Sequence, residues 1–412
     1  PRGIAKAMIS HPAPRFFDRT TPPHMFTLVM LAGLSALNMS LFLPSLNTIA
    51  AEYGVDYGVM QLAVSGYFAA TAIMQIIVGP ISDRFGRRPV VLVGFAIFTL
   101  ASAGAALAPS GTAFLGFRLV QATVATGMVL SRAVVRDLVS QDKAASMIGY
   151  VTLGMSIMPM IGPFIGGAVD EFLGWRANFW LLTGMGLLMV VLVWADQGET
   201  VRDRGLPFRE QVKQYPALLG SPRFWGYVLC NAFAAGAYYA LLGGASLVAS
   251  GVFGLSPLQT GLALGSPTVG FAVGNYISGR DSVRFGVNRM TFVGTGIASA
   301  GLAVSLAISL SGNESALLFF GFCTFLGLGN GLTMPNATAG MLSVRPHLAG
   351  TASGLGGAIM VTGGAALSAV AGSSLSPEAG SLPLQAIMFG SSVLSGVAIA
   401  FVIRRERRLG IE

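Results

Sequence analysis

Long apolar runs alternate with short polar connections along almost the whole chain. A helix that crosses a bilayer needs about 20 largely apolar residues. Twelve runs reach that length, and we expect one transmembrane helix in each. Their ranges are 25–49, 59–81, 89–108, 112–136, 144–169, 177–194, 224–250, 258–279, 288–310, 315–343, 348–372 and 383–403. The pattern therefore predicts an all-α membrane protein with twelve transmembrane helices.

One hydrophilic connection is much longer than the others and divides the twelve runs into six and six. The division predicts an N-terminal tail (1–24), a first six-helix bundle (25–194), a linker (195–223), a second six-helix bundle (224–403) and a C-terminal tail (404–412). The predicted architecture is therefore a pair of six-helix bundles.

The positions of lysine and arginine give these bundles a direction across the membrane. When the N-terminus is placed in the cytoplasm, the inner segments hold 22 of the 25 Lys and Arg residues. The outer connections then hold only Arg176. Because cytoplasmic connections carry an excess of positive charge, we expect both tails and the linker in the cytoplasm.

Composition agrees with a membrane protein. Hydrophobic residues make up 53% of the chain and charged residues 10%, whereas a soluble domain carries about 25% charged residues. The net charge of +8 follows the membrane topology and does not indicate nucleic-acid binding. Cys230 and Cys323 lie in apolar runs without the spacing of a disulfide framework or a metal site. We expect a monomer in the lipid bilayer, with no cofactor and no metal.

A short charged sequence occurs twice. "GPISDRFGRRPVVLVG" (79–94) aligns with "GRDSVRFGVNRMTFVG" (279–294) after a shift of 200 residues, and seven of the sixteen positions are identical. Each copy lies between the second and third predicted helices of its bundle. Bundles repeated in the same orientation are typical of transporters whose substrate site lies near mid-membrane between the halves.

Several motifs together resemble one transporter family. "GPISDRFGRRP" (79–89) resembles the signature turn of the major facilitator superfamily. "RLVQA" (118–122) resembles the fourth-helix motif of its drug:proton antiporters, with Ala122 in place of the usual glycine. "GMSIMPMIGPFIGG" (154–167) is similar to their fifth-helix motif. The resemblance narrows to the Bcr/CflA subfamily of bacterial multidrug exporters through "SRAVVRDL" (131–138), "GWRANFW" (174–180) and "HLAGTASGL" (347–355).

The resemblance implies the major facilitator fold in a bacterial inner membrane. It also implies export of lipophilic or amphiphilic small molecules by alternating access, coupled to protons that move inward. One position departs from many relatives, which carry an acid four residues before the proline near the end of the first helix. This chain has Ser40 before Pro44 at that place.

The first charged turn is the candidate gate, and its residues are Gly79, Asp83, Arg84, Gly86, Arg87 and Arg88. Gly79 permits close helix approach, and Gly86 permits a tight reversal of the chain. Asp83 is expected to cap a neighbouring helix or to pair with an arginine of the fourth or eleventh helix. Such a contact would close the cytoplasmic ends in the outward-facing state and break in the inward-facing state. Alternatively, the arginines only fix the topology.

Ionisable residues inside the membrane are functional candidates, because a charge at a helix centre costs about 2.5–3.5 kcal/mol to insert. Arginine stays protonated in proteins, so Arg118 is expected to act on a nearby acid or on a polar substrate group. No carboxylate lies at the centre of a predicted helix, and Asp137 is the best candidate for a coupling acid. An ion pair that orders the next connection is the favoured alternative for Asp137. The coupling candidates are Arg118, Gln121, Arg132, Arg136 and Asp137.

The fifth-helix motif consists of Gly154, Gly162, Pro163, Gly166 and Gly167. Proline removes a backbone donor and bends a helix, and glycines allow close packing against the other half. Packing alone explains the glycines, so their link to export depends on the resemblance.

Neutral polar residues on several predicted helices are candidate substrate contacts. A cavity with aromatic rings, methionines and a few amides suits lipophilic ligands and adaptable packing. Hydrogen bonds between helices explain about half of these amides equally well. The pocket candidates are Asn38, Ser40, Tyr67, Gln75, Asn231, Tyr238, Tyr239 and Asn330, with Gln61, Asn275 and Asn336 as further amides.

Other functional classes are less consistent with the sequence. No clustered nucleophile, base or metal ligand indicates an enzyme, and no Walker A pattern indicates transport driven by ATP. Two alternatives to an exporter remain. One is a facilitator or symporter of a specific metabolite or organic anion, and the other is a sensor or scaffold that does not transport.

Overall fold

The computed structural model describes residues 15–138, 161–200, 215–345, 348–375 and 380–410, together with residues 147, 151 and 158. Every regular element in these ranges is helical. The all-α fold predicted from the apolar pattern is confirmed.

The first half of the chain begins with a long helix that is broken near its end by a short 3₁₀ turn. Its described elements are α1 (Met25–Ser40), η1 (Leu43–Ser45), α2 (Leu46–Tyr53), α3 (Tyr57–Met60), α4 (Leu62–Phe85), α5 (Arg87–Ala106), α6 (Gly111–Val120), η2 (Gln121–Val124), α7 (Ala125–Leu138), helical residues 161–173, and α9 (Arg176–Asp196).

The second half repeats this order with longer, less interrupted helices. Its described elements are α11 (Tyr215–Leu219), α12 (Pro222–Ser246), η3 (Leu247–Val252), α13 (Pro257–Phe285), α14 (Val287–Leu310), α15 (Ala316–Ser343), α16 (Ala349–Ser374) and α17 (Leu382–Leu409).

Ten helical stretches among the described residues are long and apolar enough to cross a membrane. Two of the twelve predicted spans are not among these ten, each for a physical reason. Helix α13 has 29 residues, ample length, but it carries polar side chains such as Gln259 and Asn275. The predicted run 144–169 lies partly outside the described residues, and only 161–173 is a continuous described helix.

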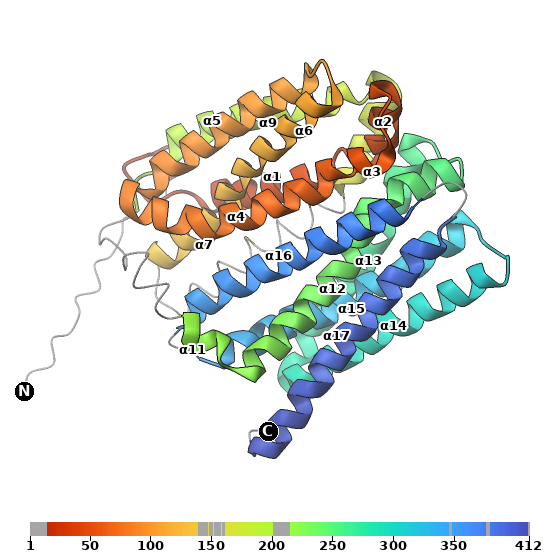
Figure 1. Cartoon of the computed structure of the whole chain (residues 1–412). Helices are drawn as coiled ribbons and strands as arrows, with labels where there is room; N and C mark the ends of the chain where they lie inside the picture. The colour runs from red at the N-terminus through yellow and green to blue at the C-terminus, as the bar shows by residue number, and fades with distance from the viewer. Residues whose placement is uncertain are drawn as a thin grey trace, which may run out of the picture.

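The helices form two packed groups that lie against each other (Figure 1). In the first, α5 packs on α9, and α1 and α4 pack on α7. In the second, α15 packs on α13 and α14, and α12 packs on α16 and α17. Helix α16 runs beside α4 and provides the most extensive contact between the groups (Figure 1). The arrangement agrees with the predicted pair of six-helix bundles.

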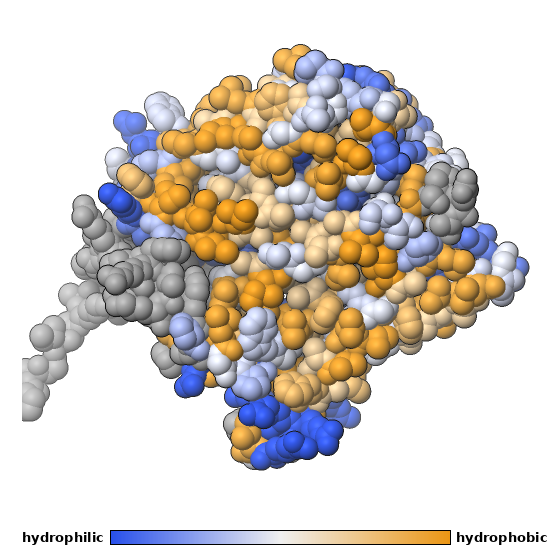
Figure 2. All heavy atoms as spheres, in the orientation of Figure 1, coloured by the Kyte–Doolittle hydropathy of each residue, from blue (hydrophilic) through white to orange (hydrophobic). Residues whose placement is uncertain are grey.

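Large apolar side chains cover the outside of the helices. Leu100, Leu187 and Leu317 are exposed over 73%, 58% and 84% of their surface. Apolar residues predominate between the helix ends and hydrophilic residues gather near the ends (Figure 2). An apolar exterior of this extent marks a surface that is covered by lipid.

The two ends of the molecule differ, and we name them by that difference. The charged end is the level of Gly86, Asp196, Gly286 and Gly410, where α4, α9, α13 and α17 finish. The closed end is the opposite level, where hydrogen bonds join the two halves.

Three of those bonds are well defined at the closed end. Tyr57 donates its hydroxyl to the carbonyl of Gly243 at 2.9 Å. Gln61 Nε2 lies 2.7 Å from the carbonyl of Ser368. Asn47 Nδ2 lies 3.0 Å from Ser250 Oγ. The inter-half hydrogen bonds between described residues all lie toward this end, so the halves are fastened there.

An acid at the end of the last helix of each half holds the start of the first helix. Asp196 ends α9 and accepts from the backbone of His24 at 2.9 Å and from Thr27 Oγ1 at 2.6 Å. Glu406 in α17 accepts from Arg223 Nε at 2.8 Å, at the start of α12. In each half, therefore, an acid at the charged end links the last helix to the first helix. The sequence repeat does not include these residues.

Candidate functional site

The charged turn is positioned by a glycine that ends one helix and precedes the next. Gly86 has φ +97° between α4 and α5. Residues with a Cβ rarely adopt this conformation, whereas glycine adopts it freely. The reversal brings the last turn of α4 and the first turn of α5 together, as the sequence predicted.

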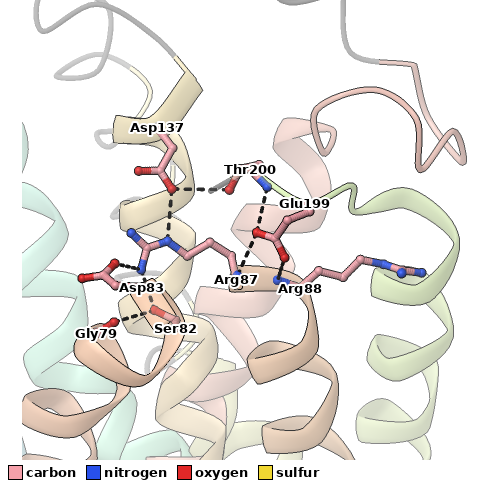
Figure 3. A network of polar contacts seen from close by, with 8 residues as sticks. All are labelled: Gly79, Ser82, Asp83, Arg87, Arg88, Asp137, Glu199 and Thr200. Atoms are coloured by element: carbon pink, nitrogen blue, oxygen red, sulfur yellow. Dashed lines mark hydrogen bonds and ion pairs between the residues drawn. The ribbon is translucent and has the colours of Figure 1, made fainter. Parts of the chain in front are cut away.

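Arg87 is the centre of this turn (Figure 3). Its Nη1 lies 2.6 Å from Asp83 Oδ1 on α4, and its Nε lies 3.0 Å from Asp137 Oδ2 on α7. The same Nη1 donates to Ser82 Oγ at 2.5 Å. The Arg87 side chain is only 10% exposed. Removing one partner of such a shielded cluster leaves the remaining charge poorly compensated.

Glu199 completes the turn from the segment that follows α9. Its Oε1 accepts from the backbone of Arg87 at 2.9 Å, and its Oε2 accepts from the backbone of Arg88 at 3.3 Å. A carboxylate at a helix N-terminus satisfies free N–H groups and complements the helix dipole. A Cβ at Gly86 would overlap this carboxylate. Glu199 therefore caps α5. Its carboxylate also occupies the space that a side chain at position 86 would need, which is a second reason for glycine there.

The predicted partners of the turn differ from those observed. Asp83 pairs with Arg87 in its own turn, and not with an arginine of the fourth or eleventh helix. Asp137 pairs with Arg87, although the sequence places it beside Arg136. The close helix contact expected at Gly79 is absent from this conformation, because a Cβ there would meet nothing within 4 Å.

The other two arginines of the turn point outward along the charged end. Arg84 lies over the ring of Phe85 at 5.4 Å. Arg88 Nη2 donates to the carbonyl of Trp194 at 2.9 Å, which ties α5 to the end of α9.

Arg118 lies fully buried inside the first half. Its Nη1 donates to Gln121 Oε1 at 2.5 Å and lies 3.3 Å from Asn38 Oδ1. The guanidinium also stacks on two rings, 4.1 Å from the centre of Phe42 and 4.6 Å from that of Tyr67. This arrangement brings together the predicted residues Arg118, Gln121, Asn38 and Tyr67.

The surroundings of Arg118 are unusual for a buried cation. Amides and aromatic faces stabilise it, and none of its hydrogen-bond partners among the described residues is a carboxylate. Its Nη2 and the Asn38 Nδ2 are buried without a hydrogen-bond partner. Unsatisfied buried donors are costly, so this centre is suited to receive an acceptor from a ligand.

Residues Gln121–Val124 form a 3₁₀ segment, η2, within the predicted fourth helix. The predicted fourth helix is therefore interrupted between Arg118 and Arg132. Arg132 lies in α7, nearer the charged end. The side chain of Arg136 lies outside the described residues. The structure therefore does not bring Arg118 and Asp137 into one cluster.

Asp170 is a buried acid that the sequence analysis did not select. It lies in helical residues 161–173 at the closed end, is only 7% exposed, and its Oδ2 has no hydrogen-bond partner. Its neighbour Glu171 accepts from Ser256 Oγ at 2.7 Å, on the other half. In the sequence, Asp170 directly follows an apolar run. An acid at such a position normally indicates a solvated helix end, so the pattern did not mark Asp170 as a candidate.

Among the described glycines of the fifth-helix motif, Gly167 meets the other half, whereas Gly162 and Gly166 pack on the first helix of their own half. A Cβ at Gly166 would overlap the backbone of Leu41, and one at Gly167 would overlap the backbone of Pro257 in the second half. Reciprocally, a Cβ at Gly261 would overlap the backbone at Pro163. Gly154 lies outside the described residues. The motif permits two backbones to touch, in agreement with the packing interpretation.

A Cβ at Gly162 would lie 2.5 Å from Ser40 Oγ, so this glycine packs directly on the position that holds an acid in many relatives. Ser40 itself is buried, and its hydroxyl has no hydrogen-bond partner. Because position 40 is a serine, it supplies no carboxylate near Arg118.

The remaining pocket candidates fall into two groups. The ring of Tyr239 contacts that of Phe68 of the other half, with centres 4.5 Å apart, and Gln75 faces Gly357 of α16, so both lie between the halves. Asn231 donates to Thr338 Oγ1 at 3.1 Å and Asn330 donates to the carbonyl of Ala234 at 2.9 Å. These two hydrogen bonds join α12 to α15 inside the second half. Asn231 and Asn330 therefore fit the alternative interpretation, in which the amides form hydrogen bonds between helices.

Tyr238 is partly buried beside its neighbour Tyr239, with ring centres 6.3 Å apart. Among the described residues there is no group of three or more His, Cys, Asp or Glu side chains able to hold a metal ion.

Comparison with known proteins gives a consistent family assignment. Residues 28–369 match the family described as Major Facilitator Superfamily. An uncharacterized MFS-type transporter YdgK of Bacillus subtilis is 30% identical, covering 93% of this chain and 95% of that protein. A chloramphenicol resistance protein of Pseudomonas aeruginosa is 32% identical, covering 77% and 76% of the two chains. A bicyclomycin resistance protein homolog of Haemophilus influenzae is 28% identical, covering 94% and 98%.

The fold also matches a solved structure. A bacterial homolog of the human lysosomal transporter Spinster, in an inward-facing and unoccupied conformation, superposes with a TM-score of 0.74. It shares 17% sequence identity, and the match covers 93% of this chain and 96% of that one.

Proposed function

The chain belongs to the Major Facilitator Superfamily, and we propose that it exports lipophilic or amphiphilic small molecules, including antibiotics, in exchange for protons. Its relatives include proteins named for resistance to chloramphenicol and to bicyclomycin. Those names, on proteins that align over most of their length, are the observation that carries the proposal. They place the chain in the Bcr/CflA type.

The arrangement of contacts supports an alternating-access cycle. The halves are fastened at the closed end by Tyr57, Gln61 and Asn47. At the charged end, the Arg87 cluster is satisfied within the first half. In the proposed cycle the closed end opens while a contact between the halves forms at the charged end, with Asp83 released from Arg87 as the latch.

The charged end is proposed to face the cytoplasm. It carries the arginine-rich turn and the basic end of α17, and cytoplasmic segments are enriched in Lys and Arg. The same orientation places the tails (1–24 and 404–412) and the linker (195–223) in the cytoplasm of a bacterial cell. The conformation described is then inward-facing.

Arg118 is proposed as the polar contact for substrate, because its Nη2 and the neighbouring Asn38 Nδ2 are buried donors without an acceptor. This feature also fits the second candidate function, transport of a specific organic anion. Pocket selectivity separates the two: an exporter of many drugs lowers the accumulation of several unrelated dyes, whereas an anion transporter acts on one chemical class.

Two acids are proposed as candidates for the proton site. Asp137, our choice from the sequence, is engaged by Arg87. Asp170 is more buried and has a carboxylate oxygen without a partner. A buried carboxylate favours its neutral form, and an ionisable residue at a membrane span is a functional candidate by default.

The test is accumulation of a panel of dyes and antibiotics in a host that lacks its own pumps, with and without an uncoupler. We expect wild-type cells to accumulate less of several unrelated compounds, and the uncoupler to abolish the difference. Asp170→Asn is expected to remove the dependence on the proton gradient, with Asp18→Asn, a change in the N-terminal segment before the first helix, as control. Efflux that persists under uncoupler would refute proton exchange.

A further inference from the structure

A cavity of about 1170 Å³ lies at the charged end of the second half, apart from the Arg118 centre and the inter-half contacts. It is formed between the charged ends of α12, α14, α15 and α17. Nothing in the proposed transport cycle uses it. Its polar lining consists of Arg223, Tyr227, Asn288, Arg289, Ser343, Arg404, Glu406, Arg407 and Arg408.

The lining carries excess positive charge. Glu406 is the only acid in it, and it is engaged by Arg223, whose Nε lies 2.8 Å from Glu406 Oε1. Tyr227 and Asn288 donate to the same carboxylate. Arg289, Arg404 and Arg408 are exposed and form no ion pair with a described residue. Three guanidinium groups around one hollow are therefore available to an anion.

The repeat gives a second, independent reason to expect an anion here. In the first half, the backbone N–H groups of Arg87 and Arg88 donate to Glu199. The shift of 200 residues places Val287 and Asn288 at the equivalent positions. The N-cap residue of α14 is Gly286, which has no side chain to accept from these N–H groups. Val287 and Asn288 line the arginine-lined cavity, so this helix start lies at its wall.

One side of the cavity is apolar. Phe285 and Phe292 line it and are exposed over 44% and 51% of their surface, and Ile403 lies between the basic residues of α17. Helix α17 has 28 residues and is about 42 Å long, whereas the hydrocarbon core is about 30 Å thick. Its basic end therefore extends beyond the apolar band, where the hydrophilic residues of α17 project (Figure 2). The cavity is at the level of lipid headgroups.

We propose that this cavity binds the phosphate headgroup of an anionic phospholipid, with its acyl chains along Phe285 and Phe292. Arginine forms paired hydrogen bonds with phosphate, and a helix N-terminus is suited to the same group. The ligand does for α14 what Glu199 does for α5. Because the site is built on the second half, the proposal does not depend on the transported substrate.

The experiment is a titration of the purified full-length chain in detergent with phosphatidylglycerol, with bound lipid counted by native mass spectrometry. Phosphatidylcholine and inorganic phosphate, as a competitor, are the comparison arms. The variant is Arg404→Gln with Arg408→Gln. The matched control is Arg405→Gln with Arg280→Gln, which removes the same charge from the same end but leaves the lining of the cavity intact.

We expect one phosphatidylglycerol to bind more tightly than phosphatidylcholine. Each basic residue near a membrane surface contributes about a fivefold gain in affinity, so the double variant is expected to bind about 25-fold more weakly and the control little changed. Ser343→Glu, which supplies a carboxylate to the cavity, is expected to displace the lipid without unfolding the protein.

Three results would overturn the proposal. Equal weakening by the control pair would assign binding to general surface charge. Equal binding of phosphatidylcholine would remove the requirement for an anion. Complete displacement by millimolar phosphate would assign the cavity to a free anion and not to a lipid.

Discussion

At the scale of single residues, one guanidinium holds the charged turn together. Arg87 contacts Asp83 on its own turn and Asp137 on α7, while its backbone is held by Glu199. The sequence identified Arg87 and Asp83 as a local cluster. It could not supply Asp137 as the partner of Arg87 or identify Glu199, because these acids are 50 and 112 positions away.

Replacing Glu199 by alanine is expected to destabilise the protein. Loss of a helix N-cap costs about 0.5–2 kcal/mol, and here it also loosens the support of the charged turn. The measurement is thermal unfolding of the variant in detergent, together with its rate of dye efflux in cells.

The control for this change is Asp281→Ala, at the same end, where the carboxylate lies 3.9 Å from the exposed Arg280. Exposed pairs of this kind contribute about 0–1 kcal/mol. If both variants unfold at the same temperature, Glu199 is not a cap that contributes to stability.

Arg118→Lys keeps the charge but loses the planar group that reaches both Gln121 and Asn38. Hydrogen bonds to charged groups contribute about 1.5–3 kcal/mol, so we expect efflux to fall at least about tenfold. The measurement is the initial efflux rate at matched protein levels in the membrane.

The matched control is Arg176→Lys. Arg176 forms an ion pair with Glu52, and each of the two side chains is 42% exposed. This variant is expected to transport at the wild-type rate. Wild-type efflux by the Arg118 variant would reduce Arg118 to a packing role.

At the scale of elements, two helices meet backbone to backbone across the halves. Helical residues 161–173 and α13 touch at Gly167 and Gly261, where a Cβ would overlap the facing chain. The sequence predicted a small-residue face on the fifth helix. It did not indicate that α13, with its polar residues, forms the opposite surface.

Gly261→Val is expected to force these helices apart and to disfavour the closed end, because the added side chain meets the backbone at Pro163. Transport is expected to fall while the protein stays in the membrane. The measurement is the reactivity of an introduced cysteine at the closed end, which should rise.

Gly279→Val on the same helix is the control, since a Cβ there meets nothing within 4 Å. Both variants change helix propensity equally, so a difference between them isolates the contact. Equal reactivity in the two variants would contradict the role given to Gly261.

At the scale of the whole molecule, the position of the inter-half contacts defines the state. Hydrogen bonds from Tyr57 and Gln61 reach the second half at the closed end. Alternating access requires these contacts to break in every cycle, so each contributes to the free-energy difference between the two states.

A disulfide between Asn47→Cys and Ser250→Cys is expected to stop transport, because the native side chains lie 3.0 Å apart across the halves. Reduction is expected to restore efflux. The native Cys230 and Cys323 are both buried and free, so they interfere little. Efflux by the fully oxidised protein would show that this end does not need to open.

The sequence by itself determined the number and approximate ends of the spans, the twofold repeat, the charged turn and the family. These features are local or periodic: the preference of a segment for lipid depends on its own side chains, and Gly86 must reverse the chain wherever its neighbours lie. Only the tertiary structure decided which end is closed, which acids meet Arg87, that Asp170 is buried, and that α14 begins at an arginine-lined cavity. Each of these depends on contacts between segments that are distant along the chain, and the free energy of such a contact cannot be read from either segment alone.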